Sequence, residues 1–543
     1  MRKKPSAART HGAPATRKRA GKGARRPTAP AARKAMARRP AAPAAPAARN
    51  AAAVPRDRAP FVPGGYPLRD LVGWELRQWA GDDGRDPASL SRLRAAAGLP
   101  DVPYNWSHGR PRPGVKPVTD AALLSIYRRA LALPIRRGFP FTEPDDLEGI
   151  RSLRPAAETR RYPIPREDGW LYDRLLGAWL GRCAGCTLGG PAEQWRPDTR
   201  ASLKRYLLAK SPLEWPITNY MPEESPCDVK IVWKRDATRE RLAYVPADDD
   251  LTHTVIAQIA LGEVQSPGEF RSIHLARTWY RFMPYVVTAG GASMLALRNL
   301  LIRYPAGLIA HGPAADADGA VDWPWVAAHS NPFREDIDGA IRADSYAYAA
   351  PGQPELAASL AWQDVRVSSV KTGIYCCMFY AAMIAAAFAL NDPLAVVEAG
   401  RAEIPASSRL YAAIGQVIEI CRRYQFRGEC FEQVLQAIYE TFGDDDCGTP
   451  NNMATIVAAV LLGDRDFEKV ITFCVMGGFD SDSTAATAGS VAGAMLGAAR
   501  LPEKWTRPLR DTLQGQIIGY HPIAVSECAR RSLEIATRFG ALG

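Results

Sequence analysis

The chain has 543 residues, 47% of them apolar, so it can bury a large core, and its composition excludes collagen-like, disulfide-scaffold and wholly disordered proteins. The formal net charge of +12 is unevenly spread, because residues 1–60 hold 17 of the 69 Lys and Arg residues and a single acid, Asp57. Residues 61–543 hold 52 basic and 56 acidic residues, so the body of the protein is mildly acidic.

The first sixty residues are predicted to be a disordered basic tail. They contain 21 Ala and 9 Pro and no aromatic residue, so they cannot bury enough apolar surface to offset the entropy lost on ordering. The apolar run of a secretory signal is missing, and the Pro content is unfavourable for an amphipathic transit peptide. Two interpretations stay open, a solvated tail and a weak nucleic-acid or polyanion contact through residues 1–60.

The rest of the chain is predicted to be all-α. Residues 61–160 read as an accessory helical region, in which a helical pattern over 118–133 is stopped by Pro134. Residues 161–543 read as one large domain of helices, because nearly every segment has a helical apolar period and Pro, Gly or Asp punctuation. No internal repeat is found.

One uncharged segment, residues 374–390, reaches about the minimum length for a membrane span. Its six Ala and two Cys favour close helix packing, so a central helix buried on all sides is predicted and no membrane contact is expected. The ten Cys lack secreted-domain or zinc spacing, and Cys183 with Cys186 and the adjacent Cys376 and Cys377 are interpreted as packed thiols. Reduced thiols favour a cytoplasmic location.

Two acidic clusters stand at the predicted starts of helices. Asp248, Asp249 and Asp250 precede one apolar run, and Asp480 and Asp482 precede a helix of small residues. One carboxylate suffices to cap a helix, and further carboxylates repel one another unless cations intervene. Oxygen ligands at this density suit Mg²⁺, Mn²⁺ or Ca²⁺, so capping and metal binding are both open for each cluster alone. The two together favour a shared two-metal site.

Three motifs, in order along the chain, resemble the ADP-ribosylglycohydrolase family. DRLLGAWLGRCAGCTLGGPAE (173–193) is similar to its opening helix, which ends in Gly-x-Pro-x-Glu. ADDDLTHT (247–254) is similar to its first metal motif, with Asp248 in place of the common Thr. GGFDSDSTAATAGSVAGAMLGA (477–498) is similar to its second metal motif. The resemblance covers about residues 165–540 and implies a compact α-helical fold.

The resemblance implies a centre of two Mg²⁺ (or Mn²⁺) ions and a site for ADP-ribose or an ADP-ribosylated macromolecule. The implied metal ligands are Asp248, Asp249, Asp250, Asp480, Asp482 and Ser483. Glu193, Asp249 and Asp482 are the candidates for positioning and proton transfer, and which of them does which stays open. His253 is also within reach of the cluster, although a single helical His is usually structural.

Further residues are candidates for contact with the rest of the ligand. Phe479 and Tyr375 could stack on adenine or line the ribose pocket, and Gly477 and Gly478 could let backbone N–H groups approach the diphosphate. Many relatives have Ser-His before the central buried helix, whereas this chain has Ser368 and Ser369, so Ser369 would have to take over the role of that His.

The sequence therefore predicts a metal-dependent hydrolase that cleaves the N- or O-glycosidic bond between ADP-ribose and a modified macromolecule. Two alternatives stay open, a catalytically weak ADP-ribose-binding regulator and a nucleic-acid-associated factor that acts through its basic tail.

Overall fold

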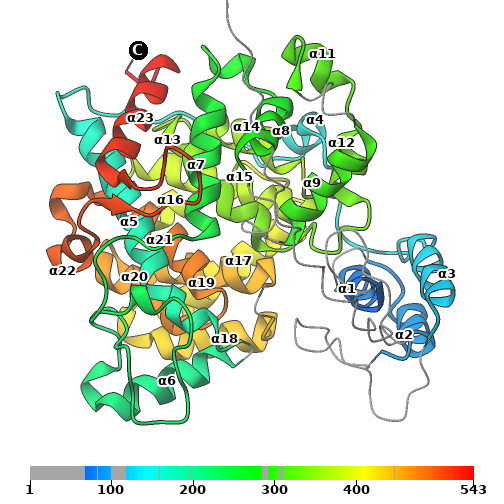
Figure 1. Ribbon diagram of the computed structural model, residues 1–543, viewed down its shortest axis with the longest axis horizontal. Coiled ribbons are helices and arrows are strands. Elements are labelled where there is room, and N and C mark those ends of the chain that lie inside the picture. Colours follow the sequence, from blue (N-terminus) through cyan, green and yellow to red (C-terminus); the bar gives the residue numbers. More distant parts are fainter. Residues whose placement is uncertain are drawn as a thin grey trace, which may run out of the picture. The chain divides into compact units, whose positions relative to one another are not determined.

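The structure is a computed structural model that describes residues 68–81, 84–99, 118–157, 159–196, 198–283, 291–304, 310–445 and 447–542 (Figure 1). The described part is helical apart from one antiparallel pair of short strands, β1 (Thr512–Leu513) and β2 (Ile523–Ala524), which confirms the all-α prediction. The predictions made for residues 1–60 lie outside the described residues.

The longer helices follow one another with short connections. The first part of the chain forms α1 (Leu68–Gly81), α2 (Pro87–Ala96), α3 (Asp120–Leu131), α4 (Leu147–Ser152), α5 (Trp170–Glu193), α6 (Thr199–Lys210), α7 (Asp249–Gly262), α8 (Ser272–Phe282) and α9 (Gly291–Arg303). The second part forms α11 (Ala314–Gly319), α12 (Trp323–Ala328), α13 (Asp344–Tyr348), α14 (Pro354–Val365), α15 (Lys371–Ala387), α16 (Pro393–Arg401), α17 (Arg409–Arg423), α18 (Phe431–Phe442), α19 (Thr449–Gly463), α20 (Phe467–Gly477), α21 (Ser481–Leu496), α22 (Glu503–Thr506) and α23 (Val525–Arg538).

Seven 3₁₀ turns connect these helices within the described residues. They are η1 (Pro212–Glu214), η2 (Arg235–Ala237), η3 (Pro267–Glu269), η4 (Ile337–Arg342), η5 (Gly428–Cys430), η6 (Ala498–Arg500) and η7 (Arg507–Leu509). The segment between α6 and α7, residues 211–248, has little regular structure besides η1 and η2. It crosses the end of α5 and contributes to the site described below.

The packing of α5 against α21 depends on glycine. Gly177, Gly181, Gly185 and Gly189 recur every four residues, so they share one face of α5. A Cβ atom at these four positions would lie only 2.0–2.5 Å from backbone carbonyl oxygens of α21. The missing side chains let the two backbones touch along their length, which brings the C-terminal end of α5 beside the N-terminal end of α21.

The segment predicted to be a central buried helix forms most of α15. Every residue of α15 after Lys371 is buried. Of the helices that the structure describes, none has the length and hydropathy that crossing a membrane requires. The ten cysteines are free thiols, and Cys183, Cys186, Cys376 and Cys377 are buried, as their interpretation as packing residues predicts.

Helices α1, α2 and α3 form a small apolar cluster of their own, and this cluster also includes residues of α9 and Phe333. Trp74 of α1 packs on Phe333 with 5.0 Å between ring centroids. Glu75 of α1 forms a buried ion pair with Arg334 at 2.8 Å. The accessory helices are therefore attached to the large domain through residues next to Phe333. The boundaries predicted at residues 60 and 160 stay predictions.

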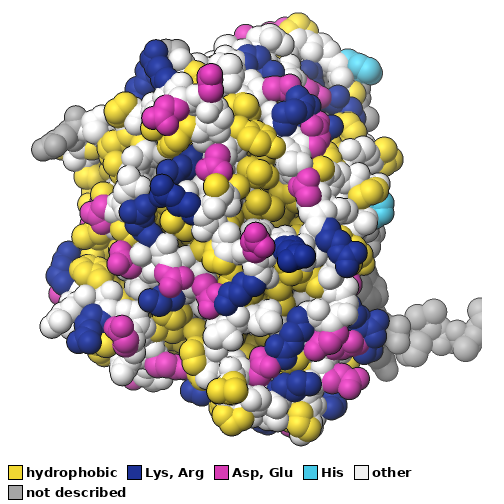
Figure 2. Space-filling view, turned by 90° about the vertical axis from the view of Figure 1, so that its left-hand side faces the viewer, with side chains coloured by type: hydrophobic (Ala, Val, Ile, Leu, Met, Phe, Trp, Pro, Cys, Tyr) yellow, Lys and Arg dark blue, Asp and Glu magenta, His cyan; other side chains and the backbone are white. Residues whose placement is uncertain are grey.

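Acidic and basic side chains are mixed over the face of the molecule drawn in Figure 2, with hydrophobic side chains between them. This mixing agrees with the near balance of charges in residues 61–543. On this face, the described residues do not form a broad patch of one sign of charge.

Candidate active site

The two acidic clusters lie at helix N-termini, as predicted. Asp248 is the N-cap of α7, and its Oδ1 accepts a hydrogen bond from the backbone N–H of Asp250 at 3.0 Å. Asp480 is the N-cap residue of α21, but its side chain makes no capping hydrogen bond. The carboxylate of Asp480 is therefore free of the role that a simple cap would give it.

The close packing of α5 on α21 brings these clusters together with Glu193, the last residue of α5. Two sets of three carboxylates each have ligand oxygens within 4.8 Å of one another, and Asp482 belongs to both sets. The first set is Glu193, Asp480 and Asp482, and the second is Asp248, Asp250 and Asp482. Ser483 joins the second set, because its Oγ donates to Asp250 Oδ2 at 2.9 Å. Clusters about 230 residues apart thus converge.

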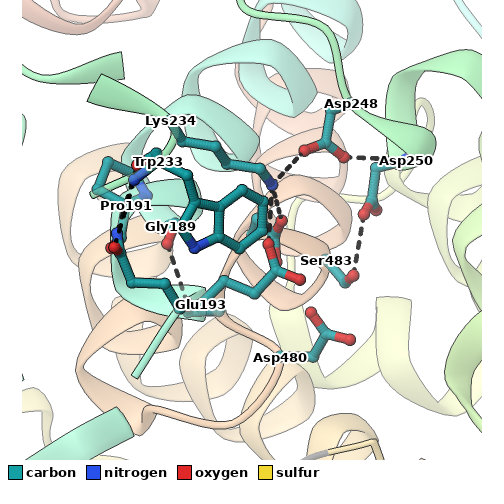
Figure 3. Close-up of polar contacts among 12 residues, drawn as sticks. Gly189, Pro191, Glu193, Trp233, Lys234, Asp248, Asp250, Asp480 and Ser483 are labelled. Carbon is teal, nitrogen blue, oxygen red and sulfur yellow. Dashed lines mark hydrogen bonds and ion pairs between the residues drawn. The ribbon is translucent and has the colours of Figure 1, made fainter. Parts of the chain in front are cut away.

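Two basic side chains enter the acidic cluster from the segment after α5. The Nζ atom of Lys234 lies 2.8 Å from Glu193 Oε2, 2.6 Å from Asp248 Oδ2 and 2.7 Å from Asp482 Oδ2 (Figure 3). Arg196 pairs with Asp480 Oδ1 at 2.6 Å and Glu193 Oε1 at 3.2 Å. Positive charges of the protein itself therefore compensate part of the carboxylate charge.

A third basic residue, Arg182 of α5, is fully buried behind the cluster. It pairs with Asp250 Oδ1 at 3.2 Å and with Asp344 Oδ2 at 2.8 Å, and it donates to the carbonyl oxygen of Ile341 at 2.7 Å. These contacts tie α5, α7, η4 and α13 to one guanidinium. Arg182 is a positioning residue, because it fixes the carboxylate of Asp250 from the side facing the core.

The acidic cluster faces a cavity of about 250 Å³. Its polar lining includes Glu193, Arg196, Asp249, Asp336, Asp338, Asp480, Asp482 and Ser483, and its apolar wall is formed by Phe333, Ile337 and Ile341. A cavity with one charged side and one apolar side is typical of a small-molecule site.

The site shifts the pKa values of its carboxyl groups in opposite directions. Burial, followed by the charge of Asp482, raises the pKa of Glu193 to about 8. Burial and the neighbouring Asp248 raise the pKa of Asp249 to about 7. Burial also acts to raise the pKa of Asp482, but Lys234, a hydrogen bond with Asp480 and Arg196 together hold it below its ordinary value. Glu193 and Asp249 can therefore exchange protons near neutral pH.

The oxygen donors fit a hard divalent cation. Carboxylate oxygens from three helix ends and one hydroxyl meet at the cavity, and nitrogen or sulfur ligands are absent from both carboxylate sets found among the described residues. Asp482 Oδ1 is buried and has no hydrogen-bond partner in the described part of the protein. A buried carboxylate oxygen without a donor is costly, and a bound cation would satisfy it.

Three further candidates lie just before Asp480 but outside this lining. Gly478 ends α20 with a positive φ of 85°, so it makes the turn between the two helices. Gly477 accepts a hydrogen bond at its carbonyl from the hydroxyl of Tyr439, at 2.8 Å, and the Phe479 ring stacks on the Tyr439 ring at 4.5 Å. Among the described residues that line the cavity, none of the three appears. Their contact with a ligand stays a prediction.

Tyr375 and Ser369 lie at the beginning of α15 and just before it. The hydroxyl of Tyr375 donates to the carbonyl oxygen of Pro144 at 2.6 Å. Ser369 is buried and lines a different cavity, which it shares with Trp323, Trp362 and other residues. The structure does not bring either residue to the carboxylate cavity, and their predicted role as ligand contacts has no support from their position.

Sequence reasoning missed the residues that come from irregular segments. Lys234, Arg196 and Asp338 belong to no motif with regular spacing, and nothing in a helical period places them beside the acids. The one available signal was Arg196, which stands three residues after Glu193 and so is placed to pair with it. His253 is buried behind the site and does not line the cavity.

Comparison with known proteins agrees with this arrangement. The family profile of ADP-ribosylglycohydrolases matches residues 168–533. Among solved structures, one described as an ADP-ribosylglycohydrolase-related protein complex is similar, with 18% sequence identity, a TM-score of 0.40 and coverage of 68% of this chain and 99% of that chain. A comparison with curated proteins gave no match. Because the matched region takes in more than half of the chain and all three converging helix ends, the chain belongs to the ADP-ribosylglycohydrolase family.

Proposed function

We propose that the protein is a divalent-metal-dependent hydrolase that removes ADP-ribose from a modified macromolecule by cleaving an N- or O-ribosyl bond. The observation that carries this proposal is the convergence of three helix ends on a cavity lined by carboxylates. Membership of the glycohydrolase family supports the same reaction class.

The cation would be held by residues whose oxygens face the cavity, Asp249, Asp480, Asp482 and Ser483. A divalent cation there supplies positive charge that can fix ribose hydroxyls and acidify a water molecule. The apolar wall formed by Phe333, Ile337 and Ile341 would exclude bulk water from the opposite side of the sugar.

Proton transfer falls to Glu193 and Asp249. Cleavage of a ribosyl bond requires one group that takes a proton from the attacking water and one that delivers a proton to the leaving atom. Both residues line the cavity, and their pKa values of about 8 and about 7 suit groups that work near neutral pH. Lys234 and Arg196 hold Glu193 in place through its two carboxylate oxygens.

The proposal is tested by a panel of ADP-ribosylated peptides and nucleic acids linked through arginine, serine, glutamate or a nucleobase, incubated with Mg²⁺, Mn²⁺ or a chelator. We expect release of free ADP-ribose from at least one linkage, and loss of that release with chelator. Release that chelation leaves unchanged would contradict the metal dependence. Metal-dependent binding of ADP-ribose without release from any linkage would identify a binding protein instead.

An isosteric substitution tests the site directly. Asp482→Asn removes the charge shared by both carboxylate sets, and we expect the rate of ADP-ribose release to fall by more than about 100-fold. The matched control is Asp316→Asn, at an exposed position on α11 outside the cluster, for which an unchanged rate is expected. Equal rates for Asp482→Asn and the control would refute the assignment.

A further inference from the structure

The ammonium group of Lys234 is fully engaged by the acidic cluster. A lysine ammonium has three N–H donors, and Lys234 has three carboxylate acceptors, one oxygen each of Glu193, Asp248 and Asp482, at 2.6–2.8 Å. These oxygens come from both carboxylate sets that could hold a metal ion. Lys234 therefore binds where a cation shared between the two sets would bind.

The backbone on the N-terminal side of Lys234 is held against the end of α5. Gln194 accepts hydrogen bonds from the backbone N–H of Val232 at 2.6 Å and donates to the carbonyl oxygen of Trp233 at 3.3 Å. The indole N–H of Trp195 donates to the carbonyl oxygen of Lys230 at 3.0 Å. The segment 230–234 thus lies across α5 as a strap, a name used below for these residues.

Local geometry directs the Lys234 side chain inward from the strap. Lys234 has a positive φ of 52°, a left-handed conformation that is unfavourable for a residue with a side chain. Its alkyl chain crosses α5 at Gly190, where a Cβ atom would lie 2.9 Å from Lys234 Cδ. Figure 3 shows the extended side chain reaching from the strap to the carboxylates. The ring of Trp233 lies 5.0 Å from Nζ and adds a cation–π contact.

We propose that the Lys234 ammonium replaces one of the two divalent cations, so that the protein holds a single divalent ion beside a built-in positive charge. This inference rests on the proposed metal dependence. A second ion between Glu193, Asp248 and Asp482 would need the same oxygens and would be repelled by the ammonium. The place left for the single ion is the side of the cluster that faces the cavity, where Asp482 Oδ1 is buried without a hydrogen-bond partner in the described part of the protein.

The number of bound ions tests this proposal without any measurement of activity. The number of Mn²⁺ ions bound per chain is determined by equilibrium dialysis of the full-length protein and of Lys234→Met, and pairs of ions are detected by their magnetic coupling in electron paramagnetic resonance. We expect one uncoupled Mn²⁺ in the unsubstituted protein and a coupled pair in Lys234→Met. Lys234→Gln, which keeps two N–H donors without the charge, is expected to match Lys234→Met and serves if that variant fails to fold.

The matched control is Lys230→Met, also on the strap, because Lys230 Nζ donates to the carbonyl oxygen of Ser225 at 3.2 Å and not to the acidic cluster. It should bind one ion. Two ions in the unsubstituted protein would overturn the role of Lys234 and leave metal dependence intact. One ion in folded Lys234→Met and Lys234→Gln would likewise overturn it. No binding by any of these proteins would overturn both this inference and the proposed metal dependence.

Discussion

His253 is a residue whose protonation state is set by the fold. It lies on α7, is buried, and both of its ring nitrogens lack hydrogen-bond partners among the described residues. Burial, and then the charges of Arg342 and Arg182, lower its pKa well below the usual value. The folded protein therefore contains neutral His253 at neutral and mildly acidic pH.

The unfolded chain takes up a proton at this residue below about pH 6.5, and the folded protein does not until a lower pH. Folding stability is therefore lost as the pH falls below about 6.5, by up to about 1.4 kcal/mol per pH unit from this group. We expect the free energy of unfolding of His253→Leu to depend less on pH in this range, as measured by urea unfolding at several pH values. His311→Gln, at an exposed position, should keep the original dependence. Identical pH profiles for His253→Leu and the unsubstituted protein would contradict this account.

Single residues differ in how far the sequence discloses their part in the site. Asp248, Asp250, Asp480 and Asp482 were predictable, because several carboxylates at one helix start exceed what capping can use. Lys234 was not predictable, because a lysine in an irregular segment carries no periodic signal and its long side chain can reach many places. The number of positive charges in the site is thus a property of the tertiary structure.

At the scale of elements, the site depends on the contact between α5 and α21. Gly185→Ala would place a Cβ atom 2.0 Å from the carbonyl oxygen of Ala485, so the two helices would have to separate. We expect a loss of about 1–3 kcal/mol in the free energy of unfolding and weaker metal binding, because Glu193 would move away from Asp482. Both quantities are measured by denaturant unfolding and Mn²⁺ titration.

The control for this substitution is Gly262→Ala, at the end of α7, where a Cβ atom would meet nothing within 4 Å. There we expect unchanged metal binding and a stability equal to or slightly above that of the unsubstituted protein. If Gly185→Ala behaves like Gly262→Ala, the close approach of α5 and α21 does not hold the site together.

The sequence was most informative about helices with a strong pattern. The period of four in the glycines of α5 and the uncharged run in α15 identify two buried helices, and both are buried in the structure. The apolar period says which face of α5 is buried but not which helix covers it. The pairing with α21, nearly 300 residues later in the chain, came from the resemblance of the flanking motifs to one family and from the structure.

At the scale of the whole molecule, the excess positive charge lies in residues 1–60, apart from the catalytic region. We propose that this tail makes salt-sensitive contacts with nucleic acid. The affinity for a random DNA duplex is measured against salt concentration for the full chain and for a variant lacking residues 1–60. A steep dependence of the affinity on salt is expected only for the full chain, because the counterions released by the basic side chains cause it. Equal slopes would rule out this role, and unchanged ADP-ribose release by the truncated protein would show that catalysis is independent of the tail.

The central claim is that the converging aspartates hold a divalent cation at the cavity. The most direct measurement is anomalous X-ray scattering at the manganese edge, from a crystal grown with Mn²⁺ and ADP-ribose. The account predicts an anomalous peak bounded by oxygens of Asp249, Asp480, Asp482 and Ser483, with the ribose against it. ADP-ribose bound in the cavity with no anomalous peak beside these carboxylates would contradict it.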